Sequence, residues 1–174
     1  HEKIFQDRLK ETRMERDGEY FYLPGKILHI DGDLEYLNRC LSFYESLGIP
    51  AIGFNEREDI VANNIYNLLE EYQPSIVVIT GHDAYYKKKG SINDLSAYKN
   101  SSKFIDAVKE ARRFESSHQK LVVIAGACQS NYEELIKAGA NFASSPKKIN
   151  IHALDPAIVA TSLAFSDKNK NIDL

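Results

Sequence analysis

Short apolar runs alternate along the chain with longer segments in which apolar residues recur at helical spacing. Continuous runs of this length, rich in Val and Ile, are typical of strands that are buried on both faces. The pattern predicts five strands, in the segments 26–33, 49–54, 75–80, 120–127 and 141–145. It predicts helices in the segments 34–48, 57–73, 102–117, 131–139 and 156–165.

Strands that alternate with helices form right-handed βαβ units, and such units build a parallel sheet. The length of 174 residues suits one compact domain. We therefore expect a single α/β domain over 1–174, with three layers, a mainly parallel sheet and the flavodoxin-like strand order 2-1-3-4-5. Residues 1–25 are expected to form a charged leader, and His1 in place of Met indicates a piece of a longer chain.

The composition indicates which binding partners and which cellular compartment to expect. A net charge of -3 gives no electrostatic reason to expect nucleic acid or an anionic membrane as a partner. No apolar run approaches the roughly 20 residues of a membrane-spanning helix. The two cysteines, Cys40 and Cys128, are too few for a disulfide framework, so we expect a reducing, intracellular setting. No metal and no cofactor are expected.

Candidate chemistry lies where the predicted strands end, because ligands of open parallel sheets bind beyond the carboxyl ends of the strands. His82 follows the third predicted strand and Cys128 follows the fourth. These strands should be neighbours about 4.8 Å apart. An imidazole beside a thiol can deprotonate it or stabilise the thiolate, which is the nucleophile. We therefore predict that His82 and Cys128 form a catalytic pair.

Other residues of these two loops fit the same chemistry. The helix predicted to begin near Asn131 would lower the pKa of Cys128. Backbone N–H groups of Asp83 and Cys128 would form an oxyanion hole. Cys40 lies instead among the apolar residues of the first predicted helix, and His29 lies inside the first strand, so both are expected to be structural.

A purely structural role is the alternative for each member of the pair. A single Cys after a core strand is usually a small buried hydrophobe. The pair is favoured because the topology places both residues at one edge of one sheet. Its spacing is also similar to that of caspases, whose His lies about 50 residues before the Cys, and the segment GACQS (126–130) shares Ala-Cys-Gln, but not the flanking residues, with the caspase motif.

Three blocks of sequence carry a resemblance to a known family: LPGKILHIDGDLEYL (23–37), GHDAYYKKKG (81–90) and AGACQSNYEELIKAGANFASSPKKINIHALDP (125–156). They resemble the YabG family of sporulation-specific proteases of spore-forming Firmicutes. The resemblance implies a cysteine endopeptidase that processes spore coat and germination-related proteins, cleaves after Arg and processes itself. It also implies protein substrates as partners and a place in the sporulating cell, in the mother cell or the spore coat.

The layout is also similar to that of the caspase, gingipain and clostripain clan, which implies a caspase-like fold and a Cys-His dyad. That clan usually has His-Gly after the third strand, whereas this chain has His82-Asp83. A pocket that selects Arg needs a carboxylate. Asp31, Asp33 and Asp155 follow predicted strands and are the candidates, with turns or helix caps as their structural alternative.

Two other functions remain open from the residues alone. The first is a receiver-like module with Asp83 as phosphoacceptor, although Gly81 and His82 displace that aspartate from the strand end. The second is a small-molecule amidase that uses Cys128. In addition, the polar segment 84–103 is longer than most connections, so we expect it to act as a lid or as a site of self-cleavage.

Overall fold

The computed structural model describes residues 26–127, 129–143 and 155–170. Five parallel strands form one sheet in the order β2-β1-β3-β4-β5, as predicted. The strands are β1 (Ile27–Asp31), β2 (Ala51–Asn55), β3 (Ile76–Thr80), β4 (Val122–Ala125) and β5 (Phe142–Ala143). The helices are α2 (Leu34–Ser46), α3 (Val61–Tyr72), α4 (Ser101–Phe114), α5 (Tyr132–Ala138) and α6 (Asp155–Lys170).

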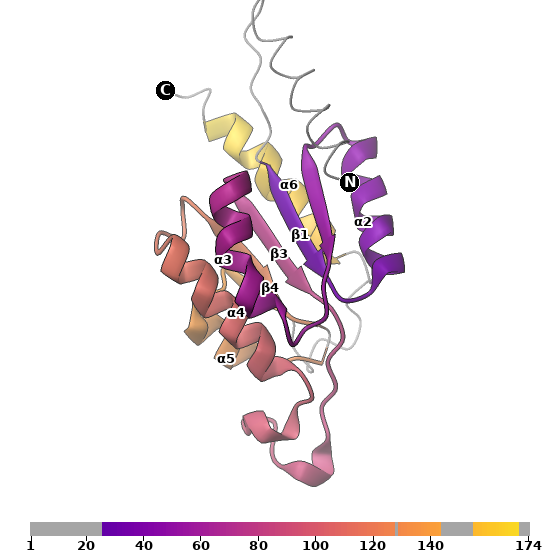
Figure 1. Cartoon of the computed structure of the whole chain (residues 1–174), viewed down its shortest axis with the longest axis vertical. Coiled ribbons are helices and arrows are strands. Elements are labelled where there is room, and N and C mark those ends of the chain that lie inside the picture. The colour runs from indigo at the N-terminus through magenta and orange to yellow at the C-terminus, as the bar shows by residue number, and fades with distance from the viewer. Residues whose placement is uncertain (1–25, 128, 144–154, 171–174) are drawn as a thin grey trace, which may run out of the picture.

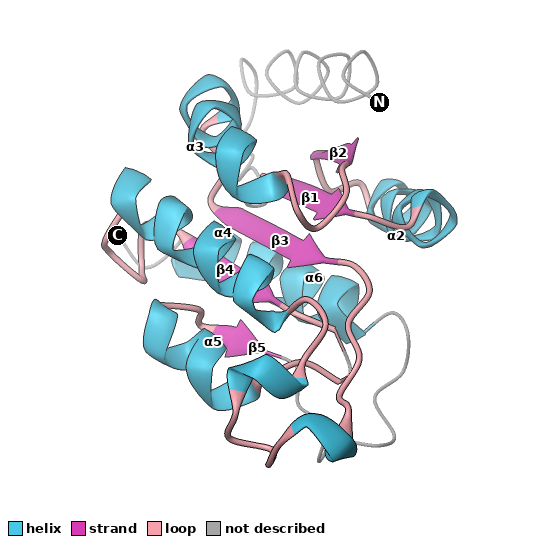
Figure 2. Ribbon diagram, turned by 60° about the horizontal axis from the view of Figure 1, so that its bottom comes forward, coloured by secondary structure: helices cyan, strands magenta, loops and turns pink. Residues whose placement is uncertain are grey.

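Helices cover both faces of the sheet, which confirms the predicted three layers (Figures 1 and 2). Helices α3, α4 and α5 pack on one face around a large apolar cluster, and α2 and α6 pack on the other. The central strands β1 and β3 are buried along their whole lengths. This burial explains why their sequences are continuous apolar runs rather than alternating patterns.

Two polar side chains determine where helices begin at the carboxyl end of the sheet. The Asp33 carboxylate accepts a hydrogen bond from the Tyr36 N–H at 3.1 Å and caps α2. The Asn131 side chain accepts from the Glu134 N–H at 3.2 Å and caps α5. Leu34 lies in the first turn of α2 and is 51% exposed.

The long connection between β3 and α4 projects beyond the carboxyl ends of the strands (Figure 1). Its two arms are joined by hydrogen bonds from the Tyr86 N–H to the Ala97 carbonyl and from the Lys99 N–H to the Ala84 carbonyl, at 2.8 and 2.9 Å. Two short 3-10 turns, Lys87–Lys89 and Leu95–Ala97, lie between them.

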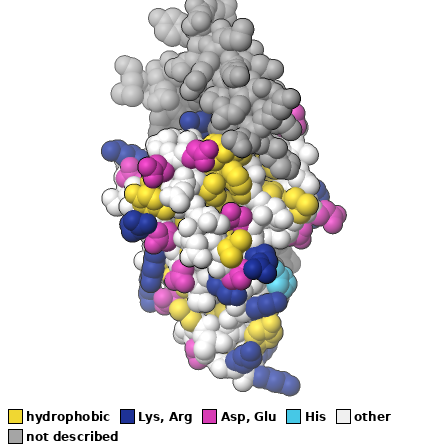
Figure 3. Space-filling model, viewed as in Figure 1, with side chains coloured by type: hydrophobic (Ala, Val, Ile, Leu, Met, Phe, Trp, Pro, Cys, Tyr) yellow, Lys and Arg dark blue, Asp and Glu magenta, His cyan; other side chains and the backbone are white. Residues whose placement is uncertain are grey.

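Charged side chains of both signs are interspersed over much of the face in Figure 3, and basic side chains gather at its lower end. The three consecutive lysines of the projection, 87–89, are exposed. No helix in the described part of the chain is long and apolar enough to cross a membrane.

Candidate active site

The two predicted catalytic residues follow strands β3 and β4, which pair directly with each other. Ile79 pairs with Ala125, and His82 and Cys128 each follow their member of this pair by the same number of residues. The prediction that their strands are neighbours is therefore confirmed. Cys128 itself lies outside the described residues, so its side chain has no described partner or exposure.

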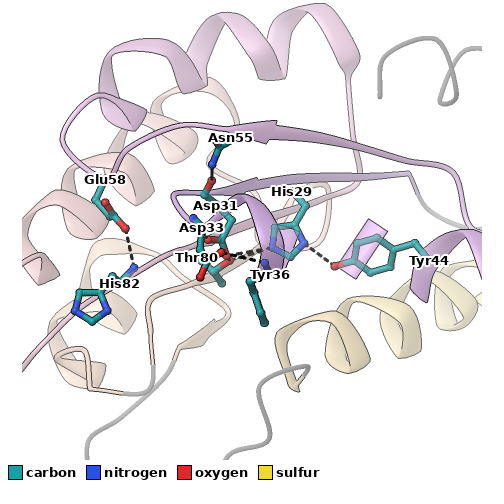
Figure 4. Close-up of polar contacts among 9 residues, drawn as sticks. All are labelled: His29, Asp31, Asp33, Tyr36, Tyr44, Asn55, Glu58, Thr80 and His82. Atoms are coloured by element: carbon teal, nitrogen blue, oxygen red, sulfur yellow. Dashed lines mark hydrogen bonds and ion pairs between the residues drawn. The ribbon is translucent and has the colours of Figure 1, made fainter. Parts of the chain in front are cut away.

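The backbone of His82 is held on both sides while its ring is exposed. Its N–H donates to Glu58 Oε1 at 2.7 Å, and its carbonyl accepts from Asn100 Nδ2 at 2.7 Å. Figure 4 shows the imidazole pointing away from the buried polar side chains between β1 and β3. A fixed backbone with an exposed imidazole is what a general base at a sheet edge requires.

Glu58 is a residue of this edge that the sequence did not single out. Its half-buried carboxylate lies over two glycines, Gly32 after β1 and Gly81 after β3. A Cβ atom at either glycine would lie 2.5 Å from Glu58 Oε1. Both glycines therefore leave room for the carboxylate to reach the His82 N–H. The glycine at each of the two strand ends was the only available signal in the sequence.

Asp83, the residue after His82, points inward and is only 5% exposed. Its Oδ1 accepts from the Ala84 N–H at 2.8 Å and from the Asn100 N–H at 2.7 Å. Its Oδ2 accepts from the Ser101 and Ser130 hydroxyls at 2.5 and 2.8 Å. The departure from the His-Gly pattern thus introduces a buried carboxylate with two donors on each oxygen.

The loop between β4 and α5 is tied to the His82 side of the site. The Ala127 N–H donates to Ser130 Oγ at 2.8 Å, and the Asn131 N–H donates to Ser101 Oγ at 2.9 Å. The Tyr85 N–H donates to Gln129 Oε1 at 3.1 Å. These contacts involve described residues on both sides of position 128 in the sequence.

Gly126 allows the backbone to turn directly after β4. Its φ of 100° lies in a region that residues with a side chain rarely adopt. A Cβ atom there would also lie 2.7 Å from Leu135 Cδ1. The Ser130 N–H then closes the turn by donating to the Ala127 carbonyl at 3.0 Å.

The three candidate pocket carboxylates have different surroundings. Asp31 is 1% exposed, and its oxygens accept from the Asp33 N–H at 2.7 Å and from the Thr80 hydroxyl. Asp33 is exposed, although it caps α2. Asp155 begins α6, and its side chain lies outside the described part of the structure. Of Asp31 and Asp33, therefore, only Asp33 reaches solvent.

A buried row of hydrogen-bonded side chains, Tyr44, His29, Thr80 and Asp31, joins α2 to the ends of β1 and β3 (Figure 4). Tyr44 Oη and Thr80 Oγ1 each lie 2.9 Å from a His29 ring nitrogen. Since the Thr80 hydroxyl donates to Asp31, it accepts from His29 Nε2–H, and His29 Nδ1 accepts from the Tyr44 hydroxyl. The predicted structural role of His29 is thus confirmed.

Burial controls the ionisation of this row. It lowers the pKa of His29 to about 3, so the ring is neutral. It raises the pKa of Asp31 to about 6 against the lowering effect of the Thr80 hydrogen bond. Burial also raises the pKa of the nearby Cys40 thiol to about 11, which agrees with the packing role expected for that residue.

Among the described residues, no group of three or more His, Cys, Asp or Glu side chains is arranged to hold a metal ion.

The family model described as YabG peptidase U57 matches residues 1–174. The chain belongs to the YabG peptidase U57 family. It is 45% identical over 169 residues to the sporulation-specific protease YabG of Bacillus subtilis (strain 168). This alignment covers 97% of the chain and 58% of that relative, so the chain spans little more than half of the relative's length.

Solved structures similar to this one include receiver domains. The receiver domain of the Francisella response regulator 1452 has a TM-score of 0.52 at 15% identity, covering 82% of this chain and 98% of that one. The receiver domain of the sensor histidine kinase PA1611 from Pseudomonas aeruginosa PAO1 has a TM-score of 0.51 at 12% identity, covering 82% and 98%. At such identities the similarity shows the fold alone.

Proposed function

We propose that this chain is the peptidase domain of a sporulation protease and cleaves peptide bonds with a Cys128–His82 dyad. The observation that carries the proposal is the pairing of β3 with β4: an exposed, backbone-anchored histidine and, in the sequence, the cysteine follow the paired residues Ile79 and Ala125 by the same number of residues. Membership of the YabG peptidase family supports a peptidase rather than another hydrolase on this sheet.

In the proposed reaction, His82 takes the proton of the Cys128 thiol and the thiolate attacks the scissile carbonyl carbon. The imidazolium then gives this proton to the leaving amine as the C–N bond breaks. Water hydrolyses the resulting thioester and restores the thiol. The N–H groups of Asp83 and Cys128 hold the oxyanion of each tetrahedral intermediate. The Asp83 N–H suits this role because it has no acceptor among the described residues.

We propose cleavage after Arg, with an aspartate at the strand ends to bind the guanidinium. Asp33 is the most accessible candidate, because the Asp31 carboxylate is enclosed between β1 and β3. Asp155 is the third candidate. Spore coat and germination-related proteins, and the enzyme's own chain, are the proposed substrates, in the sporulating cell. The name of the Bacillus subtilis relative supports the link to sporulation.

A receiver-like function of Asp83 finds no support at this site. A phosphoacceptor carboxylate must have an oxygen free to attack phosphate, whereas both oxygens of Asp83 are buried and hydrogen-bonded twice. The similarity to receiver domains therefore extends to the arrangement of strands and helices only.

The test compares cleavage of Arg-containing peptides by the parent, Cys128→Ala and His82→Ala. Each substitution should lower the rate at least about 100-fold, because it removes the nucleophile or its base. His118→Ala is the matched control, since His118 is also exposed but lies far along the chain, before β4. Cleavage retained by either dyad variant would rule out the mechanism. Turnover of glutamine without peptide cleavage would favour an amidase.

A further inference from the structure

We infer that Asp83 is a positioning residue, whose carboxylate fixes the loop 127–131 relative to His82 through Ser101 and Ser130. These three residues are called the Asp83 clamp. The inference rests on the proposed function, because it assigns a role to the position of the Cys128 loop.

The acceptor capacity of the Asp83 carboxylate is fully used. A carboxylate offers about four acceptor sites, two on each oxygen. Two backbone N–H groups occupy Oδ1 and two serine hydroxyls occupy Oδ2. A buried carboxylate of this kind is stable only when such donors replace its hydration. The arrangement therefore joins the His82 loop, the start of α4 and the β4–α5 loop at one point.

Each serine passes the constraint from Asp83 to the second loop. A hydroxyl has one proton to donate, and both serines donate it to Asp83. Their oxygens remain free to accept, and they accept the backbone N–H groups of Asn131 and Ala127, respectively. The loop is thus held at two points that lie on either side of Cys128 in the sequence.

The direction of these hydrogen bonds requires an acceptor-only group at position 83. An asparagine could keep the carbonyl oxygen at the place of Oδ1. Its amide group, however, would donate toward two hydroxyls that already accept backbone N–H groups, and both hydroxyl protons would lose their acceptor. Glycine, the usual residue at this place in the clan to which the layout is similar, would provide none of these contacts. We therefore expect a nearly isosteric substitution to change the position of the loop.

The contacts to the His82 backbone do not involve the two serine hydroxyls of the clamp. Glu58 holds the N–H of His82, and Asn100 Nδ2 holds its carbonyl. The Asn100 N–H in turn donates to Asp83 Oδ1, the oxygen whose place a carbonyl could keep in Asp83→Asn. Loss of the serine contacts in this variant should consequently leave His82 in place and displace the loop that carries Cys128. A displacement of about 1 Å between reacting groups can lower a rate about 100-fold.

The experiment uses Asp83→Asn and Ser130→Ala in the whole protein, with Asp94→Asn as matched control. Asp94 also accepts hydrogen bonds from a serine, Ser96, but on the exposed surface of the projection. The measurements are kcat and KM on an Arg-containing peptide, the thermal midpoint, and the rate of Cys128 alkylation by iodoacetamide against pH. Alkylation is measured in a Cys40→Ala background.

We expect Asp83→Asn to lower kcat about 10- to 100-fold with KM within about threefold of the parent, and Ser130→Ala to lower it less. The alkylation profile should lose the reactive form seen at low pH, because the thiolate is no longer paired with His82. Asp94→Asn should match the parent in all measurements.

An unchanged kcat and alkylation profile in folded Asp83→Asn would overturn the inference, and so would a loss of rate that merely follows the unfolded fraction. If Asp83→Asn fails to fold, Ser130→Ala decides by the same criteria. The proposed function is judged separately by Cys128→Ala. Cleavage that survives this substitution refutes the dyad, whereas an inactive Cys128→Ala beside a fully active Asp83→Asn refutes only the clamp.

Discussion

The two sides of strand β3 carry the same three residue types, a histidine, an aspartate and a cysteine, but the two histidines lie in opposite surroundings. On the side of β1, His29, Asp31 and Cys40 are all buried. Burial keeps His29 neutral, raises the pKa of Asp31 and keeps the Cys40 thiol protonated. The hydrogen bonds of this side join β1, β3 and α2 to one another, so they hold the sheet together.

On the side of β4, the histidine faces solvent and the aspartate faces inward. His82 is exposed, and the Asp83 carboxylate is bonded to its neighbour Ala84 and to residues of two other segments, the start of α4 and the β4–α5 loop. Cys128 follows β4 in the sequence. The contrast between the buried His29 and the exposed His82 shows that residue types alone do not define a catalytic site. A site also requires access for the nucleophile and base, and hydrogen bonds that join loops rather than adjacent strands.

The largest expected contrast is in thiol reactivity. In the folded protein, iodoacetamide should alkylate Cys128 at least about 1000-fold faster than Cys40, because the Cys40 thiol is buried and its pKa is about 11. Mass spectrometry of peptides after timed labelling at pH 7 measures both rates. After unfolding in urea, the two rates should converge. Equal rates in the folded state would contradict the difference between the two sides.

The second contrast is the pH dependence of stability on the β1 side. In Asp31→Asn, the free energy of unfolding should fall as pH decreases below about 6.5. The reason is that His29 takes up a proton when unfolded but remains neutral when folded down to about pH 3. The slope should be about 1.4 kcal/mol per pH unit. Urea unfolding between pH 4 and 6.5 measures it.

The complementary variant, His29→Gln, should show the opposite slope. The folded Asp31 carboxyl has a pKa of about 6, raised from 3.8, so the folded state binds this proton before the unfolded state does. Stability should therefore rise as pH falls from 6 to 4. In the parent the two slopes oppose each other and leave a shallow profile. If stability changed with pH in the same direction in both variants, a neutral His29 beside an Asp31 carboxyl with a raised pKa would be contradicted.

A third contrast compares removal of the two buried aspartates. Asp83→Ala leaves four donors without an acceptor, whereas Asp31→Ala leaves two and also removes a desolvated carboxylate. We expect a loss of about 3 kcal/mol for Asp83→Ala and about 1 kcal/mol for Asp31→Ala at pH 7. Urea denaturation with matched m-values tests the order. A larger loss of stability in Asp31→Ala than in Asp83→Ala would contradict the expectation that the Asp83 carboxylate stabilises the fold more.

The smallest contrast concerns Glu58, which contacts the His82 backbone. Glu58→Gln retains a carbonyl oxygen for the His82 N–H and should leave cleavage close to that of the parent. Glu58→Ala removes the acceptor and should lower kcat a few-fold, with a loss of stability of about 1 kcal/mol. Asp59→Ala is the control, because the exposed Asp59 pairs only with exposed Arg57. Equal effects of Glu58→Ala and Asp59→Ala would exclude a positioning role.

Local patterns in the sequence predict the succession of strands and helices and the end of the sheet where chemistry can occur. Apolar periodicity and the handedness of βαβ units are local rules, and five strands that obey them fit the flavodoxin-like order 2-1-3-4-5. The same rules placed His82 and Cys128 after neighbouring strands, and the helical pattern around Cys40 predicted its burial correctly.

The directions in which the carboxylates point depend on contacts between distant segments. Asp83 bonds to Ser130, 47 residues away, and Glu58 bonds to the His82 backbone, 24 residues away. Such contacts depend on how loops from different βαβ units meet, which no local pattern encodes. Asp31 shows the same limit, since the turn-like DGD segment conceals a carboxylate buried against Thr80. Periodicity thus specifies the sheet edge, and packing between distant segments specifies which of its polar groups remain accessible.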